Sequence, residues 1–290
     1  MSIEVKHLSH SYEKGTPFEK NALIDVSFTL EKGEFVGVIG HTGSGKSTLI
    51  QHLNALLVPS EGTVLYDGQD VFQEDAKALR KTLRQKVGLV FQYPEHQLFE
   101  MTVYKDVAFG PTNMKLPEEE IKTRVEWALD LVGIGKEYYD KSPFDLSGGQ
   151  RRRVALAGVL AMRPEYLILD EPAAGLDPRG RDELLGNILK LKETTDMAVL
   201  LVSHSMNDVA EYVDRLLVMA GGRLVYDDKP EKVFRHREEL EQMGLAVPEI
   251  VELGNLLRDE GIPVDESVIR MEDMEEELVR LFGPRREVTV

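Results

Sequence analysis

The chain has 290 residues, a formal net charge of −16, a 42% hydrophobic fraction and no cysteine. The apolar content is too high for a disordered chain, and the lack of cysteine excludes disulfide scaffolds, iron–sulfur clusters, thiolate zinc sites and cysteine nucleophiles. No apolar run approaches the roughly 20 residues that cross a bilayer, and the first residues lack the apolar core of a signal peptide. The acidic net charge disfavours nucleic acid as a partner. We expect an intracellular protein with one large α/β domain and an appendage.

Short β-branched segments alternate with helical segments along the chain. Strands are expected at residues 3–8, 26–30, 35–39, 63–66, 87–91, 166–169, 198–202, 215–219 and 224–226. Three of them, 35–39, 166–169 and 198–202, are almost wholly apolar, as expected of central parallel strands that are buried on both faces. The early strands lie closer together and contain the turn signal Asp67-Gly68, which indicates an antiparallel layer.

The residues that start and stop helices locate the main helical segments. Helices are expected at residues 45–57, 117–133, 148–162, 251–260 and 267–282. Pro59 stops the first of them, and three glutamates in the first turn of the second favour its N-terminus because of the helix macrodipole. The largely helical interval 71–162 is long enough to form a helical subdomain inserted between strands.

The composition changes near residue 231. Residues 231–290 contain 16 acidic and 8 basic residues, so half of the net charge lies in the last fifth of the chain. The two helices expected there are amphipathic with acidic outer faces. This segment is either a dimerisation element or a solvated acidic appendage that packs on its own domain.

The first chemical signal is the run Gly-His-Thr-Gly-Ser-Gly-Lys-Ser at 40–47, the phosphate loop, which follows a strand and opens a helix. Its glycines let successive backbone N–H groups surround phosphate oxygens, and the helix N-terminus adds partial positive charge. Lys46 would bind the β- and γ-phosphates, and the Ser47 hydroxyl would ligate Mg²⁺. The strand–loop–helix context disfavours an ordinary glycine-rich turn. The nucleotide-binding residues predicted here are Gly40, His41, Thr42, Gly43, Ser44, Gly45, Lys46, Ser47 and Thr48.

A second signal is the acid pair Asp170-Glu171 at the end of an apolar strand. Carboxylates at the C-terminal end of a parallel strand lie where α/β sheets bind ligands. Asp170 would face the metal ion, and Glu171 would hold a water for attack on the γ-phosphate. A solvated pair of acids is the common alternative, but the phosphate loop in the same chain favours the catalytic interpretation.

The third signal is the segment Leu-Ser-Gly-Gly-Gln at 146–150, the signature segment, which opens another helix. Ser147, Gly148, Gly149 and Gln150 offer a hydroxyl and free N–H groups to an anion. A helix cap with a flexible turn is the alternative for an arbitrary Ser-Gly-Gly. A second phosphate site in a chain that already has one needs an explanation.

Together these motifs resemble those of ATP-binding-cassette (ABC) ATPases, the nucleotide-hydrolysing subunits of membrane transporters, over about residues 1–235. The matching elements also include a glutamine loop at Gln92, a linking loop at 174–177 and a switch histidine at His204. The resemblance implies the α/β fold of P-loop NTPases, with a mostly parallel core sheet, an antiparallel β layer, a helical subdomain at about 93–162 and a C-terminal helical extension at 236–290. It also implies that two cassettes pack head to tail, so that the signature segment of one closes over the ATP held by the other.

The resemblance assigns further roles residue by residue. Tyr12 would stack on the adenine, Gln92 would contact Mg²⁺ and the attacking water, His204 would hydrogen-bond the γ-phosphate, and Asp177 would join the two half-sites. A surface tyrosine and a structural histidine are the alternatives for Tyr12 and His204. The implied reaction is in-line attack of water on the γ-phosphate with Glu171 as the general base.

The segments 90–99 and 171–177 resemble, more narrowly, the ATPases of energy-coupling factor importers, and the second of their two ATPase types. That resemblance implies uptake of vitamins or transition-metal ions at the cytoplasmic face of the membrane. The partners would be a related ATPase, a transmembrane coupling protein, whose helix enters the groove after the glutamine loop, and a substrate-binding membrane protein. The chain departs from the common Ser-Ala-Leu-Asp linking loop at Gly175.

Three alternatives remain at the level of the sequence. The chain could serve another class of ABC importer, which the same motifs would also fit. A soluble cassette without a transport role is disfavoured by the presence of one cassette and by the charge of −16. A module that binds ATP without hydrolysing it is disfavoured because Lys46, Glu171 and His204 are all present.

Overall fold

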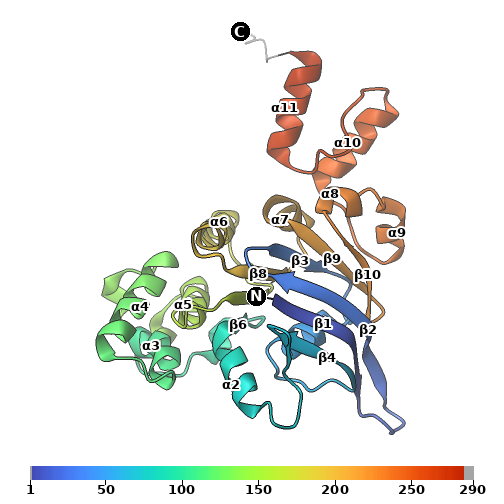
Figure 1. Cartoon of the computed structure of the whole chain (residues 1–290). Helices are drawn as coiled ribbons and strands as arrows, with labels where there is room; N and C mark the ends of the chain where they lie inside the picture. Colours follow the sequence, from blue (N-terminus) through green and yellow to red (C-terminus); the bar gives the residue numbers. More distant parts are fainter. Residues whose placement is uncertain (1, 284–290) are drawn as a thin grey trace.

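The computed structural model describes residues 2–283, which form an α/β arrangement of two sheets with surrounding helices (Figure 1). The first sheet has the strand order β2-β1-β4-β5 and is antiparallel throughout. Its strands are β1 (Ser2–Tyr12), β2 (Lys20–Glu31), β4 (Glu61–Tyr66) and β5 (Gln69–Asp70). The antiparallel layer expected from the early strands is therefore confirmed.

The second sheet has the order β10-β9-β3-β8-β7-β6. Its strands are β3 (Phe35–Ile39), β6 (Val87–Val90), β7 (Tyr166–Asp170), β8 (Ala198–Val202), β9 (Arg215–Ala220) and β10 (Arg223–Asp228). All neighbours are parallel except β9 and β10. Every residue of β3, β7 and β8 is buried, which confirms them as central parallel strands.

The apolar core has two main parts because successive side chains of a strand point to opposite faces. On β7, Tyr166 and Ile168 belong to the cluster that includes residues of the antiparallel sheet, whereas Leu167 and Leu169 belong to the cluster on the other face. Each such buried side chain contributes about 1.5–3 kcal/mol relative to an exposed one. The strand thus holds its acidic C-terminal end rigidly between two cores.

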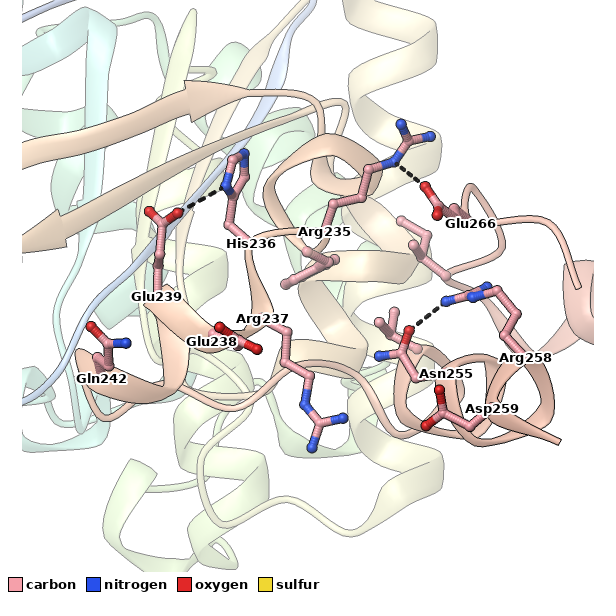
Figure 2. A pocket seen from close by; sticks show the side chains of 13 residues that line it. Arg235, His236, Arg237, Glu238, Glu239, Gln242, Asn255, Arg258, Asp259 and Glu266 are labelled. Carbon is pink, nitrogen blue, oxygen red and sulfur yellow. Dashed lines mark hydrogen bonds and ion pairs between the residues drawn. The ribbon is translucent and has the colours of Figure 1, made fainter. Parts of the chain in front are cut away.

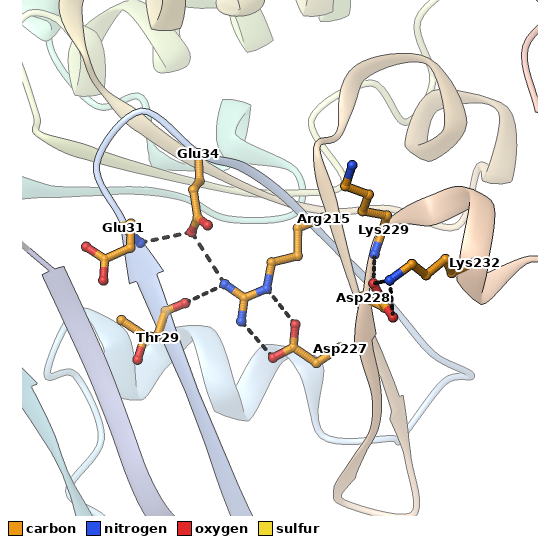
Figure 3. Close-up of polar contacts among 8 residues, drawn as sticks. All are labelled: Thr29, Glu31, Glu34, Arg215, Asp227, Asp228, Lys229 and Lys232. Atoms are coloured by element: carbon orange, nitrogen blue, oxygen red, sulfur yellow. Dashed lines mark hydrogen bonds and ion pairs between the residues drawn. The ribbon is translucent and has the colours of Figure 1, made fainter. Parts of the chain in front are cut away.

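An arginine on β9 joins the two sheets (Figure 3). Arg215 donates from Nη1 to the backbone oxygen of Thr29 on β2 at 2.9 Å, and its Nε and Nη2 atoms bind the Asp227 carboxylate at 2.5 and 2.7 Å. Glu34 lies 3.5 Å from Nη1. Because the guanidinium is planar and has several donors, it can hold both sheets in one geometry.

The helices cover the sheets and extend from them (Figure 1). They are α1 (Lys46–Leu53), α2 (Lys77–Lys86), η1 (Pro94–Gln97), α3 (Val103–Asn113), α4 (Glu118–Leu131), η2 (Lys136–Tyr138), η3 (Pro143–Asp145), α5 (Gly148–Leu160), α6 (Pro178–Thr195), α7 (Met206–Tyr212), α8 (Pro230–Val233), α9 (Arg237–Gln242), α10 (Glu249–Asp259) and α11 (Met271–Phe282). The helices α3, α4 and α5 pack on one another to one side of the sheets and share the apolar cluster on that face of the core sheet. In residues 2–283 we find no helix with the length and apolarity that a membrane span requires.

Two expected helix boundaries were wrong, and some helices were not anticipated. The first helix ends at Leu53 rather than 57, because the buried Asn54 side chain donates to the Val87 carbonyl at 2.6 Å and the next residue, Ala55, is left-handed. The last helix begins at Met271 rather than 267, because Ser267 instead binds the Asp265 carboxylate through its N–H and hydroxyl. The helices α6 and α7 were not anticipated.

The C-terminal segment is partly anchored on the main core. Leu240, Leu245, Val247 and Ile269 are buried in the same cluster as the core sheet, and Arg270 donates to the Ala210 carbonyl at 3.0 Å. Beyond this, α10 and α11 share a small core of their own and extend away from the sheets in Figure 1. A cavity of about 540 Å³ lies between α9 and α10 (Figure 2).

Candidate functional site

The phosphate loop lies between β3 and α1 and is packed closely against neighbouring strands. Gly45 has a φ of +106°, and a Cβ atom there would lie 2.5 Å from the Ala22 carbonyl oxygen. At Gly40 a Cβ atom would lie 2.3 Å from the Met219 carbonyl oxygen. Any larger residue at either position would displace the loop. The two glycines therefore fix the loop between β2 and β9.

Lys46 is held at the floor of the loop. Its Nζ donates to the Gly40 carbonyl at 2.6 Å and to the His41 carbonyl at 3.2 Å. Burial lowers the pKa of this lysine, and the nearby carboxylates of Glu171 and Asp170 oppose that shift. The backbone carbonyls hold the ammonium in place, and the carboxylates favour its charged form. In that form it can bind phosphate oxygens.

Ser47 and Asp170 bring oxygen atoms together at the end of β7. The Ser47 hydroxyl donates to Asp170 Oδ2 at 3.4 Å, and burial raises the pKa of Asp170. The Gln92 side chain lines the same cleft. Hydroxyl, carboxylate and amide oxygens are suitable ligands for Mg²⁺, which also keeps water and phosphate ligands. These three residues therefore fit a magnesium ion bound together with phosphate.

Glu171 follows Asp170 and is partly buried, in a left-handed backbone conformation with a φ of 53°. Its N–H donates to the Val202 carbonyl at 3.0 Å, which ties it to β8. Burial raises the pKa of Glu171 to about 7. Within residues 2–283, its Oε1 atom is buried without a hydrogen-bond partner, and the His204 Nε2 atom lies 3.4 Å away. A carboxylate in this setting can accept a proton from a bound water.

These side chains surround one cleft of about 290 Å³, which we call the phosphate-loop cleft. Its lining residues are Tyr12, Lys20, Ala22, Thr42, Gly43, Gly45, Lys46, Ser47, Thr48, Gln92, Asp170, Glu171 and His204. The Tyr12 hydroxyl is 3.2 Å from Thr48 Oγ1. The structure therefore brings together residues from four separate motifs and from the first strand.

Some predicted residues of the phosphate loop do not line this cleft with their side chains. The His41 ring is exposed, and its Nδ1 atom is 2.8 Å from the Thr42 carbonyl oxygen. Ser44 is buried beneath the loop. Conversely, Lys20 and Ala22 line the cleft although no motif contains them. Their position follows from the pairing of β1 with β2, in which Lys20 is the partner of Tyr12.

The signature residues lie apart from the phosphate-loop cleft, at the start of α5. The Ser147 hydroxyl accepts from the Gln150 N–H at 3.3 Å, and the Gln150 side chain accepts from the Ser147 N–H at 3.0 Å. Ser147 and Gly148 are exposed. Asp177 similarly caps α6 by accepting from the Gly180 N–H at 2.7 Å. None of Ser147, Gly148, Gly149, Gln150 and Asp177 is among the lining residues.

The cavity in Figure 2 is larger but has a different character. Its arginines pair with groups of the same chain: Arg235 with Glu266 at 3.7 Å, and Arg258 with the Val264 carbonyl at 3.1 Å. It contains none of the motif residues. The chemistry predicted from the sequence therefore belongs to the smaller cleft.

Comparison with known proteins identifies the family. The ABC transporter family model matches residues 23–174. The energy-coupling factor transporter ATP-binding protein EcfA2 of Clostridium tetani is 52% identical over 98% of both chains, and that of Symbiobacterium thermophilum is 55% identical over 94% of both. The chain belongs to this family of ABC transporter ATP-binding proteins. The resemblance stated from its motifs is confirmed.

Solved structures give the same fold. A cbiO1 structure from Clostridium perfringens, described as part of the ABC transporter complex cbiONQ, has a TM-score of 0.73 and 38% identity, covering 88% of this chain and 98% of that one. The dimeric ATP-binding cassette MJ0796, bound to ADP and Pi, has a TM-score of 0.71 and 28% identity, covering 79% of this chain and 98% of that one. The ABC cassette fold of this ATP-binding protein is therefore confirmed.

Proposed function

We propose that this ABC ATPase hydrolyses ATP as one of two paired ATP-binding subunits of an energy-coupling factor importer, bound to the cytoplasmic face of the membrane. The observation that carries the proposal is the convergence of Lys46, Ser47, Asp170, Glu171 and His204 on one cleft. Its relatives are named as energy-coupling factor transporter subunits. The imported cargo would be a vitamin or a transition-metal ion.

The cleft would hold the triphosphate along the phosphate loop. Lys46 would bind the β- and γ-phosphates from the position that the Gly40 and His41 carbonyls give it. Ser47, Asp170 and Gln92 would hold Mg²⁺, which when bound neutralises charge on the β- and γ-phosphate oxygens. His204 would hydrogen-bond the γ-phosphate from the same side as Glu171.

Glu171 would act as the general base. Its carboxylate would hold the attacking water in line with the γ-phosphate and accept a proton as the P–O bond to ADP breaks. A pKa of about 7, raised by burial, suits a base that works near neutral pH. In residues 2–283 the buried Oε1 atom makes no hydrogen bond, and its near neighbour is the His204 Nε2 atom at 3.4 Å, which supports a role in binding water.

Pairing with a second ATPase explains the separate signature site. In this chain Ser147 and Gly148 are exposed at the start of α5 and do not line the cleft of their own cassette. In a head-to-tail pair, they would close over the γ-phosphate of the neighbour. Each ATP would then lie between a phosphate loop and the signature segment of the other subunit.

A cluster of exposed apolar side chains supports a membrane partner. Tyr93, Phe99, Met101 and Phe109 are each between 45% and 79% exposed, and the Phe99 and Phe109 rings are in edge contact at 4.9 Å. Tyr93, Phe99 and Met101 lie between Gln92 and α3, and Phe109 is on α3. We propose that this surface receives a helix of the transmembrane coupling protein, which would transmit ATP binding to the transporter.

The proposal is tested by capture from detergent-solubilised membranes that contain the neighbouring membrane proteins. We expect the wild-type chain to co-purify with them, and the double variant Phe99→Asp, Phe109→Asp to lose capture while keeping its ATPase activity. Val58→Asp changes an equally exposed apolar residue outside this surface and serves as the control. A chain that hydrolyses ATP but never co-purifies would instead be a soluble cassette without a transport role.

We also propose that the C-terminal extension contributes to subunit pairing. Leu253 and Leu256 on α10, and Met271, Val279 and Phe282 on α11, are exposed apolar residues. Truncation at residue 240 would uncover buried core residues, so substitutions are the better test. The double variant Leu256→Asp, Phe282→Asp should lower the oligomeric mass measured by light scattering. An unchanged mass would leave the extension as an acidic appendage.

A further inference from the structure

Lys20 is the first residue of β2 and lies opposite Tyr12 in the antiparallel pairing of β1 and β2. Directly opposed residues of an antiparallel pair project from the same face of the ribbon, with Cβ atoms about 4.5–5.5 Å apart. Both side chains line the phosphate-loop cleft. Lys20 and Tyr12 are therefore neighbours in the lining of that cleft.

The Lys20 ammonium is available for a ligand. Across residues 2–283, no carboxylate lies within ion-pairing distance of it and no hydrogen bond from Nζ is formed. The other lysine of the cleft, Lys46, is already bound to two carbonyls at the phosphate end. The cleft thus has two cations with separate positions, one beneath the loop and one beside the aromatic ring.

The proposed roles of the lining residues indicate what Lys20 contacts. Tyr12 is the residue proposed to stack on the base, and Lys46 is proposed to bind the β- and γ-phosphates. The ribose connects these two parts of ATP. Lys20 lies beside Tyr12 and shares the cleft with Thr42 and Gly43 of the loop. An ammonium has three donors and no acceptor, so it requires oxygen acceptors such as ribose hydroxyls.

We infer that Lys20 is a nucleoside-binding residue whose ammonium donates hydrogen bonds to the ribose hydroxyl oxygens of the bound nucleotide. The inference rests on the proposed ATP site and adds a contact that none of the motifs includes. Because the side chain is exposed, solvent weakens the contact. We expect its loss to weaken ATP binding about threefold to tenfold, the range of an ordinary hydrogen bond and below that of a hydrogen bond to a charged group.

The test is a titration of the full chain, with Mg²⁺, against ATP, 2′,3′-dideoxy-ATP and inorganic tripolyphosphate. Lys20→Met removes the charge but keeps the stem of the side chain. It should weaken ATP binding about threefold to tenfold while leaving the binding of dideoxy-ATP and tripolyphosphate unchanged. Lys20→Arg should restore most of the ATP affinity. In steady-state hydrolysis, Lys20→Met should raise KM and leave kcat unchanged, because the contact is the same in the ground and transition states.

Lys14→Met is the matched control, because it changes the net charge equally and Lys14 does not line the cleft. It should bind all three ligands as the wild type does. An equal loss of affinity for all three ligands in Lys20→Met, or no loss for ATP, would overturn the inference. A wild-type chain that binds neither ATP nor tripolyphosphate would instead refute the proposed ATP site, so the two failures are distinguishable.

Discussion

The N-termini of two helices in this chain contain glycines and a serine, but they differ in whether a side chain already accepts hydrogen bonds from their first N–H groups. At α1, the N-cap residue is Gly45 and no side chain caps the helix. At α5, Ser147 and Gln150 cap each other reciprocally. The first start lies inside a cleft with a buried lysine, and the second is exposed. The N-terminus of α1 is therefore open to phosphate in the isolated chain, whereas the N-terminus of α5 is already capped and, in the proposed pair, would meet the phosphate of the partner's ATP.

The largest expected effect is on the catalytic base at the α1 side. Glu171→Gln keeps the shape of the side chain but removes its ability to accept a proton. We expect kcat to fall about 10²- to 10⁴-fold, the usual contribution of a general base, while ATP still binds. Phosphate release and equilibrium titration measure the two quantities. A variant that hydrolyses ATP at nearly the wild-type rate would remove Glu171 from this role.

A matched pair of variants distinguishes the roles of the two helix N-termini. Lys46→Ala removes the buried ammonium and should weaken ATP binding to the isolated chain about 100-fold, as expected for two charge-assisted contacts of about 1.5 kcal/mol each. Ser147→Ala should leave that affinity unchanged but lower the ATPase rate of the paired subunits about tenfold, for one such contact. Equal loss of ATP affinity in both isolated variants would contradict the comparison.

The pH dependence of hydrolysis reports on the same base. Burial raises the pKa of Glu171 to about 7, and only the deprotonated carboxylate accepts the proton. The rate should therefore rise about tenfold for each pH unit below this pKa and level off above it. A pH–rate profile under saturating ATP measures this. A rate that is flat from pH 5 to 8 would show that this carboxylate is ionised throughout.

The smallest effect is expected at His41, whose ring is exposed and lies outside the cleft lining. Its backbone carbonyl, not its side chain, binds Lys46. His41→Ala should therefore change ATP affinity less than about twofold, as is usual for surface substitutions. A loss comparable to that of Lys46→Ala would show that the ring contacts the nucleotide.

The sequence predicted the fold well where local spacing determines structure. The apolar strands β3, β7 and β8 and the loop that follows β3 could be located because burial on both faces and a fixed glycine spacing leave direct signals. The α1 C-terminus could not, because the Asn54 contact with Val87 joins residues far apart in the chain. The start of α6 was missed although Asp177-Pro178 is a typical N-terminal signal.

The same distinction between local and distant determinants decides which site residues could be predicted. Residues within motifs, such as Lys46, Ser47 and Asp170, could be selected from the sequence alone, and the structure brings them to one cleft. Lys20 and Ala22 could not, because their position depends on the strand register between β1 and β2. The sequence also did not show that the His41 ring would face solvent, because a loop motif specifies backbone geometry more strongly than side-chain direction.

The most direct test of shared ATP sites uses the absence of cysteine from the chain. Ser147→Cys is introduced with Glu171→Gln, and one cysteine is placed in the phosphate loop of the paired ATP-binding subunit, within the assembled complex. A short cross-linker with two thiol-reactive groups, such as a bismaleimide, should join the two subunits with saturating ATP and Mg²⁺, and much less without nucleotide. If ATP produces no increase in cross-linked subunits, the signature segment does not close over a neighbour's ATP and the account is contradicted.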